Sequence, residues 1–534
     1  MESGTGTLPD RSRGTGDDGF DVSVIIPVFN TMPYLTACLE SIRGQTMGLG
    51  RIQVVAVDDG STDGGGHELD RFADLHPQSV VVRHQPNSGG PANPCNEGLA
   101  LATGRYLFFL GADDYLAPDA LQRLVTKADQ WGSDIIFGTM VGVNDRYVDQ
   151  RIYQTEEQEL TFLTHPLAYS LSNTKLFRRA LIEESGLRYP EDLKVGSDQL
   201  FVVQAVLKAR RVSVLTGEPF YYAVKRENAS NITYASSWRS RLTDVTKIMD
   251  RIAALVPDDE ELRDSILRRH FHFELGNLLK RDFPDLPHDD QQELLRRYAE
   301  LADRYLTERI AARLPVDQRA AARIAHLGDQ VTLAELARYD RDHPPQLVLR
   351  NGQGFSDLPG SETYPEGWYQ HSPGVLQERL EANAEVTDLR LEGSSVLVSG
   401  KTRIRVESPD QMYVALVKVG PDHVSLPARR IESHRLKSRR IHPVTVHPGS
   451  SEAGALWDVR VALPVVPDMP REGLDWEARL RFEVDRWSYD LPIRLAVPSD
   501  RALARERLAW QSLRLETQPD GYVRIHQRLA VRLN

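Results

Sequence analysis

The chain has 534 residues, of which 65 are Lys or Arg and 76 are Asp or Glu, so its formal net charge is −11. Its length predicts roughly two to four domains, and the acidic balance argues against general nucleic-acid binding, which needs a basic face. Its two cysteines, Cys38 and Cys95, exclude a disulfide scaffold and a cysteine-rich metal site. No apolar run approaches the roughly 20 residues that cross a bilayer, so we expect a cytoplasmic protein, at most peripheral to a membrane.

Residues 1–19 are rich in Gly, Ser, Thr and Asp and predict a disordered tail. After the tail, apolar runs typical of buried strands alternate with segments of helical spacing. The runs lie at 22–29, 52–57, 80–82 and 105–110. This alternation predicts an α/β domain with a mostly parallel, Rossmann-like sheet over residues 20–237, and ligands of such sheets bind beyond the carboxyl ends of the strands.

Three further segments follow the α/β domain. Residues 238–352 show helical spacing with little strand signal and predict a helical connector, and residues 353–384 are rich in Gly, Pro and Ser and predict a linker. In residues 385–534 the apolar period changes to two, as in the runs that begin at Trp457 and Trp476. Such runs between Pro and Gly turns predict an antiparallel β-sandwich, which we expect to be the surface for any homo-oligomer.

Four polar clusters stand at predicted strand ends or at a helix start. They are Pro27–Asn30, Val57–Asp63, Leu110–Asp114 and Gly196–Phe201. Each could simply cap a helix or form an Asx turn. Two different strands, however, end in an adjacent pair of carboxylates, and like charges at a ligand edge cost energy unless a cation or a ligand offsets them. Mg²⁺ or Mn²⁺ bridging phosphates would suit such oxygen ligands.

Together, the segments 22–30, 58–63, 87–99 and 104–114 resemble the family-2 inverting glycosyltransferases of the GT-A fold. The resemblance covers about residues 20–235 and implies a nucleotide-sugar donor, with a UDP-sugar expected first. It places Pro27, Val28 and Asn30 beside the base of that donor and has Asp59 hydrogen-bond the pyrimidine.

The same resemblance implies roles for the later motifs. Asp113 and Asp114 would end the Asp-x-Asp motif that holds the ribose and a Mn²⁺ or Mg²⁺ ion, and Asn96 would contact the donor. Asp198 would be the general base, in the motif Ser197–Phe201. Arg226 matches a segment that reaches the diphosphate or the acceptor, although an ordinary surface ion pair explains it equally well.

The chain departs from the family pattern at three positions. Gly111 stands where the first Asp of the Asp-x-Asp-Asp form is usual, Cys95 replaces an Arg, and Ser197 replaces the Glu before the base. These departures bear on metal affinity and diphosphate contacts. The Gln-x-x-Arg-Trp motif and the membrane helices of processive polysaccharide synthases are not evident, so the sequence argues against such a synthase.

The overall layout also resembles the soluble bacterial glycosyltransferases that decorate poly(ribitol phosphate) wall teichoic acid, in which β-rich modules mediate trimerisation. We therefore expect transfer of a hexose, GlcNAc-type or related, to a hydroxyl of a cell-wall glycopolymer. Six basic residues and one acid between Arg429 and Arg440 could bind such a polyanion, although a charge run of this kind is more often a solvated loop. Two alternatives stay open: a tailoring glycosyltransferase for a small secondary metabolite, and a non-catalytic sugar-nucleotide-binding scaffold.

Overall fold

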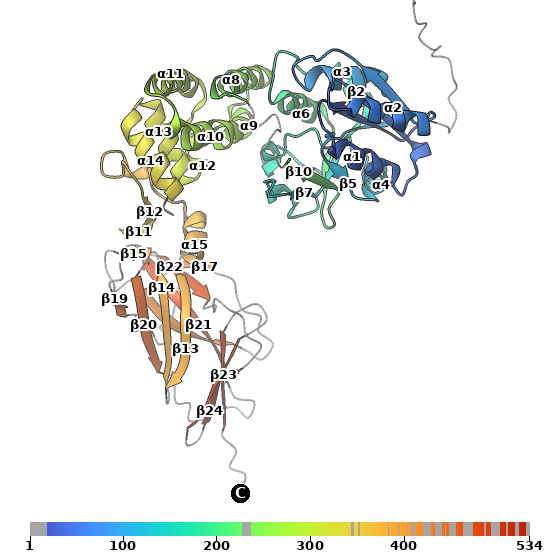
Figure 1. The fold of residues 1–534 in the computed structure, drawn as a ribbon. Coiled ribbons are helices and arrows are strands. Elements are labelled where there is room, and N and C mark those ends of the chain that lie inside the picture. The colour runs from blue at the N-terminus through green and yellow to red at the C-terminus, as the bar shows by residue number, and fades with distance from the viewer. Residues whose placement is uncertain are drawn as a thin grey trace, which may run out of the picture. The chain divides into compact units, whose positions relative to one another are not determined.

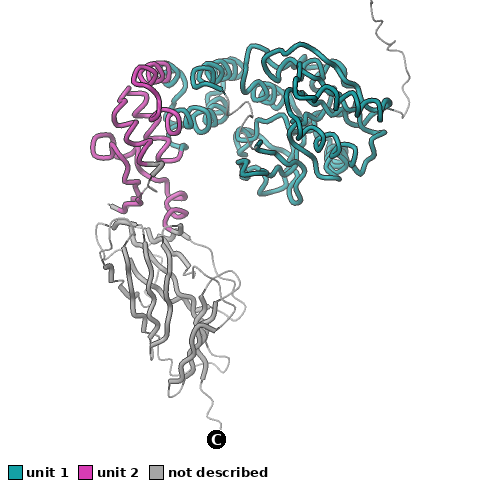
Figure 2. Tube along the Cα trace, viewed as in Figure 1, with its two compact units in different colours: residues 1–278, 300–314 teal, residues 279–299, 315–534 magenta. Residues whose placement is uncertain are grey.

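The computed structural model describes residues 19–226, 236–342, 346–350 and 353–382, and beyond these the backbone of a set of strands between 384 and 529 (Figure 1). The predicted tail therefore lies outside the described residues, apart from Gly19. The chain forms two compact units (Figure 2). The first comprises residues 1–278 and 300–314, and the second comprises residues 279–299 and 315–534.

A seven-stranded sheet of order β3-β2-β1-β4-β8-β6-β9 forms the centre of the first unit. Its strands are β1 Val22–Val28, β2 Ile52–Asp58, β3 Val80–His84, β4 Tyr106–Phe109, β6 Ile135–Gly138, β8 Leu176–Arg178 and β9 Val212–Leu215. The prediction of a mostly parallel α/β sheet is confirmed, and β8 is the strand that runs antiparallel to both its neighbours. Every residue of β2 is buried, as its uninterrupted apolar run predicts.

Six helices of this unit follow or lie between the strands of the sheet (Figure 1). They are α1 Tyr34–Arg43, α2 Gly65–Leu75, α3 Ala92–Leu101, α4 Ala120–Trp131, α5 Arg179–Glu184 and α6 Ser197–Lys208. The face of α1 that is buried consists of Leu35, Cys38, Leu39 and Ile42, the four residues of its apolar spacing. Helix α3 lies so close to β1 that a Cβ at Gly98 would be 2.4 Å from Cγ2 of Ile25. Glycine therefore permits this helix to approach the sheet.

A second, smaller sheet has the order β5-β10-β7. Its strands are β5 Tyr115–Leu116, β7 Met140–Val143 and β10 Tyr221–Val224. Strand β5 begins directly after Asp113 and Asp114, and β10 ends two residues before Arg226. Since β5 and β10 pair with each other, this sheet brings two predicted site segments together that are more than a hundred residues apart in sequence.

A helical region follows the α/β domain, as predicted. It contains α8 Trp238–Leu255, α9 Glu260–His272, α10 Glu274–Asn277, α11 His288–Tyr305, α12 Glu308–Arg313, α13 Val316–His326 and α14 Gln330–Asp342. Ser237, Asp259 and Thr307 cap three of these helices by accepting a hydrogen bond from a backbone amide three residues later. None of the helices in the part of the chain that the structure describes is long and apolar enough to cross a membrane.

The predicted linker contains regular elements, namely β12 Gln353–Asp357 and α15 Pro373–Ala382. Strand β12 pairs with β11 Gln346–Arg350, which in turn pairs with β15 Ile404–Val406. A Cβ at Gly354 would lie 2.2 Å from Cδ1 of Leu376, so the glycine allows α15 to pack on this strand. Some of the Gly and Pro residues that predicted a linker therefore have another role: Gly354 permits close packing, and Pro373 begins α15.

The C-terminal region consists of antiparallel strands, as the period of two predicts. One sheet has the order β13-β14-β20-β19 and the other follows the path β17-β22-β21-β25-β24-β23, with β16 paired to β21 and β18 paired to β16. These strands are β13 Ala384–Glu392, β14 Ser395–Thr402, β16 Met412–Val419, β17 Arg429–Glu432, β18 Ile441–Pro443, β19 Thr445–His447, β20 Ala455–Ala462, β21 Leu474–Val484, β22 Trp487–Pro492, β23 Ala502–Leu508, β24 Gln511–Thr517 and β25 Val523–Leu529. The side chains of the basic stretch 429–440 lie outside the described residues, and the face-to-face packing of a sandwich stays a prediction.

Candidate functional site

The predicted site segments meet at one edge of the large sheet. Strands β1, β2 and β4 run parallel, so the residues that follow them share the carboxyl edge. The amide of Asp59 donates to the carbonyl of Val28 over 2.8 Å, which fastens the end of β2 to the end of β1. The Val28 side chain itself is 1% exposed and belongs to the core.

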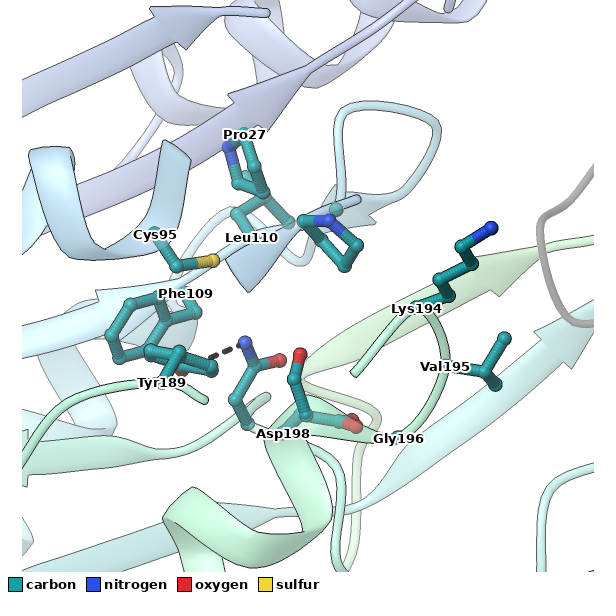
Figure 3. A pocket seen from close by; sticks show the side chains of 13 residues that line it. Pro27, Cys95, Phe109, Leu110, Tyr189, Lys194, Val195, Gly196 and Asp198 are labelled. Carbon is teal, nitrogen blue, oxygen red and sulfur yellow. Dashed lines mark hydrogen bonds between the residues drawn. The ribbon is translucent and has the colours of Figure 1, made fainter. Parts of the chain in front are cut away.

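A pocket of about 200 Å³ opens at this edge (Figure 3). It is lined by Pro27, Pro91, Cys95, Phe109, Leu110, Gly111, Asn173, Tyr189, Lys194, Val195, Gly196, Ser197 and Asp198. Of the predicted site residues, it brings together Pro27 and Asp198, and it also contains all three departures from the family pattern. Gly111 and the candidate base Asp198 therefore line the same pocket, whereas Asp113 and Asp114 are not among the lining residues.

Asp198 lies in the first turn of α6, the third residue after Val195 of the pocket wall. Gly196 precedes the helix in a left-handed conformation with φ +79°, which glycine adopts without strain. Burial raises the pKa of the Asp198 carboxyl above its ordinary value, although the charge of Arg269 and the nearby backbone amides oppose this rise. A half-buried carboxylate with a raised pKa beside a pocket suits a general base.

Asp113 and Asp114 are adjacent in sequence but differ in their surroundings. The Asp114 side chain is buried, and its two oxygens accept hydrogen bonds from the Tyr221 hydroxyl at 2.6 Å and the Val224 amide at 2.7 Å. Burial and the charge of Asp113 raise the pKa of Asp114 despite these bonds. Asp114 thus anchors the small sheet, whereas the Asp113 side chain keeps 15% of its surface exposed.

Arg226 lies beside Asp113. Its Nε donates to Oδ2 of Asp113 at 2.8 Å, and an Nη atom donates to the carbonyl of Asn30 at 3.3 Å. Both partners are predicted site residues, and both side chains of the ion pair are only 15% exposed. The structure therefore brings Arg226 into the site instead of leaving it as a solvated surface ion pair.

Asn30 and Asp59 are both engaged with neighbouring loops. Asn30 has a left-handed backbone with φ +48°, and its side-chain oxygen accepts from the Thr62 amide at 2.8 Å. Asp59 is 3% exposed and accepts hydrogen bonds from Gln85 at 2.6 Å and from the hydroxyl of Ser88 at 2.9 Å. These contacts shape the end of the sheet, and a nucleobase would meet Asp59 only by sharing or replacing one of them.

Asn96 forms hydrogen bonds to the segment that contains Tyr189. Its amide nitrogen donates to the Tyr189 carbonyl and to Glu191, both at 2.9 Å, and its oxygen accepts from the Tyr189 amide at 2.8 Å. Both the nitrogen and the oxygen of the Asn96 side chain are therefore hydrogen-bonded to residues of the protein. Asn96 therefore supports Tyr189, which lines the pocket.

Sequence reasoning assigned no individual role to several residues of this region. Phe29 follows β1 and is 45% exposed, an unusual position for a large aromatic side chain that could stack on a base. Tyr189 and Asn173 line the pocket and are joined by a hydrogen bond of 3.0 Å. An aromatic residue at the carboxyl end of a buried strand was a usable signal for Phe29, but nothing in the sequence places residues 173 and 189 beside residue 198.

Two family models match parts of this chain. Residues 23–186 match the family described as glycosyl transferase family 2, and residues 241–337 match the glycosyl transferase TarS linker domain. The N-terminal α/β domain is thus similar to family 2 glycosyltransferases over residues 23–186. The family-2 match ends before β9 and Asp198, and the linker-domain match falls on the helical region that follows.

Two similar proteins are named as poly(ribitol-phosphate) glycosyltransferases. The chain is 35% identical over 262 residues to the poly(ribitol-phosphate) beta-N-acetylglucosaminyltransferase TarS of Staphylococcus aureus, covering 48% of this chain and 45% of the relative. It is 27% identical over 360 residues to a poly(ribitol-phosphate) beta-glucosyltransferase of Bacillus spizizenii, covering 64% and 54%. The chain spans about half the length of these relatives.

Solved structures show the same fold. The structure of S. aureus TarS 1–349 in complex with UDP-GlcNAc has a TM-score of 0.55 at 28% identity, covering 66% of this chain and 99% of that chain. A structure of S. aureus TarS has a TM-score of 0.64 at 22% identity, covering 96% and 86%. The second likeness supports the fold over most of the chain.

Proposed function

We propose that this protein is an inverting glycosyltransferase that moves a hexose from a UDP-sugar to a hydroxyl group of a poly(ribitol phosphate)-type wall polymer. The observation that carries the proposal is the position of Asp198, which lines the same pocket as Gly111, two residues before Asp113. The acceptor class rests on the relatives, two of which act on poly(ribitol phosphate). GlcNAc and glucose are both candidate sugars, because each is named for one relative.

The donor would bind along the carboxyl edge. Phe29 and Asp59 would meet the base, Pro27 and Asn30 would flank it, and Arg226 would neutralise the diphosphate. Support for a UDP-sugar comes from the complexes of the related TarS 1–349 with UDP and UDP-GlcNAc. The pocket of about 200 Å³ beside Asp198 would then receive the sugar rather than the whole donor.

A divalent ion fits this site through Asp113. In the part of the chain that the structure describes, no three His, Cys, Asp or Glu side chains gather as a ligand set. Mg²⁺ commonly binds one or two carboxylates together with substrate phosphates and water. Asp113 can serve in that way, whereas Asp114 does not fit, because both of its oxygens are used and it is buried. When bound, such an ion would offset the negative charge of the diphosphate.

The proposed chemistry is a single displacement. Asp198 would accept the proton of the acceptor hydroxyl while that oxygen attacks the anomeric carbon, and the bond from this carbon to the UDP oxygen breaks. Arg226 would stabilise the charge that develops on the departing UDP. Attack opposite the leaving group inverts the anomeric configuration.

We also propose that the two C-terminal antiparallel sheets form a sandwich that mediates homo-oligomers, with a trimer expected first. Light scattering on the full chain tests this: a trimeric mass would support it, and a monomeric mass at all concentrations would overturn it.

Transfer itself is tested with radiolabelled UDP-GlcNAc and UDP-glucose and a ribitol-phosphate oligomer. We expect polymer-bound label with the full chain, and its loss by a factor of about 10² or more in Asp198→Asn. Asp74→Asn, an exposed aspartate on α2, is the matched control. Retained transfer by Asp198→Asn would overturn the base assignment. UDP binding without transfer or donor hydrolysis would favour the scaffold, and label on small molecules alone would favour the tailoring enzyme.

A further inference from the structure

The loop that leads to Asp198 is held by the first helix of the connector. The amide of Val195 donates to Oδ2 of Asp244 on α8 at 3.2 Å. On the same helix, Lys247 and Arg251 form ion pairs with Asp192 at 3.2 and 2.9 Å. Helix α8 therefore contacts the loop at two positions, Asp192 and Val195.

A second contact comes from α9 and α10 and reaches the turn that carries Asp198. Gln199, the next residue, donates from Nε2 to Oε1 of Glu274 at 3.0 Å. Arg269 donates to the same oxygen at 2.6 Å, and Nδ1 of His270 lies 3.2 Å from the other oxygen. Glu274 thus joins the first turn of α6 to two residues of α9.

One charge of this network, that of Arg269, acts on the pKa of Asp198. Among the charged groups that lower the pKa of Asp198, Arg269 has the largest effect, followed by Lys175, which is fully buried before β8. Burial lowers the pKa of Lys175 to about 7. Two further titratable side chains face Asp198, namely Cys95 of α3 and Tyr189, and the Asp198 charge adds to the burial that raises the pKa of each.

Glu274 and His270 are the remaining titratable side chains of this network. Burial alone would raise the pKa of Glu274, but the Arg269 charge and the His270 hydrogen bond lower it to about 2, so Glu274 is a carboxylate. Burial lowers the pKa of His270, so this side chain is neutral near pH 7. The network therefore pairs one cation, Arg269, with one anion, Glu274, next to the candidate base.

We propose that Glu274 and Arg269 are positioning residues for Asp198: Glu274 fixes the base-bearing turn through Gln199, and the two opposite charges set the field at the Asp198 carboxylate. The inference rests on the proposed function of Asp198 as base. It gives the connector a role in catalysis, since both residues lie in the segment 241–337 that matches the TarS linker domain, and neither lines the pocket.

The two charges predict opposite effects on pH dependence. Arg269→Gln removes a positive charge, which raises the pKa of Asp198, so the acidic limb of the kcat–pH profile moves to higher pH. Glu274→Gln removes the anion that offsets Arg269, so the same limb moves to lower pH. Each shift is expected to be about half to one pH unit. Both variants should also lose roughly 10-fold in kcat, because the turn is less well held.

The experiment measures kcat against pH for the full chain and the two variants, with UDP binding and melting temperature as checks. Glu260→Gln, which removes the exposed partner of Arg263 on α9, is the matched control and should leave the profile unchanged. Arg269→Lys keeps the charge and should restore the wild-type limb even if its kcat stays low. UDP affinity should not change in any of them.

Opposite shifts with intact UDP binding support the proposal. Losses of kcat without a shift, or shifts in the same direction, would overturn it. If Arg269→Gln does not fold, the profiles of Glu274→Gln and Arg269→Lys still decide, since the first must shift downward and the second must not shift. An inactive wild-type chain would instead contradict the proposed function, so the two failures are distinguishable.

Discussion

The hydroxyl of Tyr221 donates a hydrogen bond to Oδ2 of Asp114 over 2.6 Å. The same hydroxyl accepts from the amide of Gly111 at 3.2 Å. Tyr221 belongs to β10, whereas Gly111 and Asp114 follow β4, so one buried phenol ties the small sheet to the Asp-x-Asp segment. This tie places Arg226, just beyond β10, beside Asp113.

Removing that hydroxyl should therefore cost stability. Tyr221→Phe leaves Oδ2 of Asp114 and the Gly111 amide without their partner, and a buried polar group without a hydrogen bond costs about 1–3 kcal/mol. We expect a fall of that size in the free energy of unfolding, measured by urea denaturation. Tyr147→Phe, at a side chain that is 72% exposed, is the control. Equal stability of the two variants would contradict the role assigned to Tyr221.

The two aspartates should separate stability from activity. Asp114→Ala leaves the Tyr221 hydroxyl and the Val224 amide unpaired and should lower the free energy of unfolding by about 2 kcal/mol or more. Asp113→Asn can still accept from Arg226, so its stability should change little while transfer and its dependence on added Mn²⁺ fall. Denaturation and a Mn²⁺ titration of activity measure both effects. The reverse pattern would assign the cation ligand to Asp114.

Gly111 should not tolerate a side chain. A Cβ at this position would lie 2.7 Å from Oδ2 of Asp114 and 3.3 Å from Oδ1 of Asp113. Overpacking of this kind costs about 1–3 kcal/mol, so Gly111→Ala should melt at a lower temperature. Gly111→Asp, which restores the usual family residue, should be destabilised as well and should not raise transfer. Gly217→Ala would be a poor control, since its φ is +94°, whereas Gly367→Ala has open space and an ordinary backbone.

His84 should make stability depend on pH. Its hydrogen bonds to Asp58 and Asp70, both of 3.0 Å, raise the pKa of His84 above its ordinary value. Because the folded state binds the proton more tightly, this contribution is present below the pKa of the unfolded chain and is lost as pH rises through the raised pKa. The melting temperature of His84→Gln should therefore fall further below wild type at about pH 6 than at about pH 9. His67→Gln, at an exposed position on α2, should show no such difference.

Local patterns in the sequence were enough to predict most of the strands and helices and some of the site residues. Uninterrupted apolar runs predicted β1, β2 and β4, because a strand covered on both faces needs apolar side chains throughout. The period of two predicted the strands around Trp457 and Trp476. Motifs at strand ends pointed to Pro27 and Asp113, since the carboxyl ends of parallel strands converge, and the family resemblance pointed to Asp198 at a helix start.

Other parts of the site depended on the tertiary structure, because they are contacts between distant segments. Asp113 and Asp114 are adjacent and cannot be distinguished from the sequence. In the folded protein Tyr221 and Val224 bind Asp114, which anchors the small sheet, whereas Asp113 remains at the site beside Arg226. The same holds for Glu274, whose contact with Gln199 joins residues 75 positions apart. By itself, the sequence determined which charged residues stand at the carboxyl edge of the sheet. Packing, which buries some of those groups and pairs others, decided which of them remain available for chemistry.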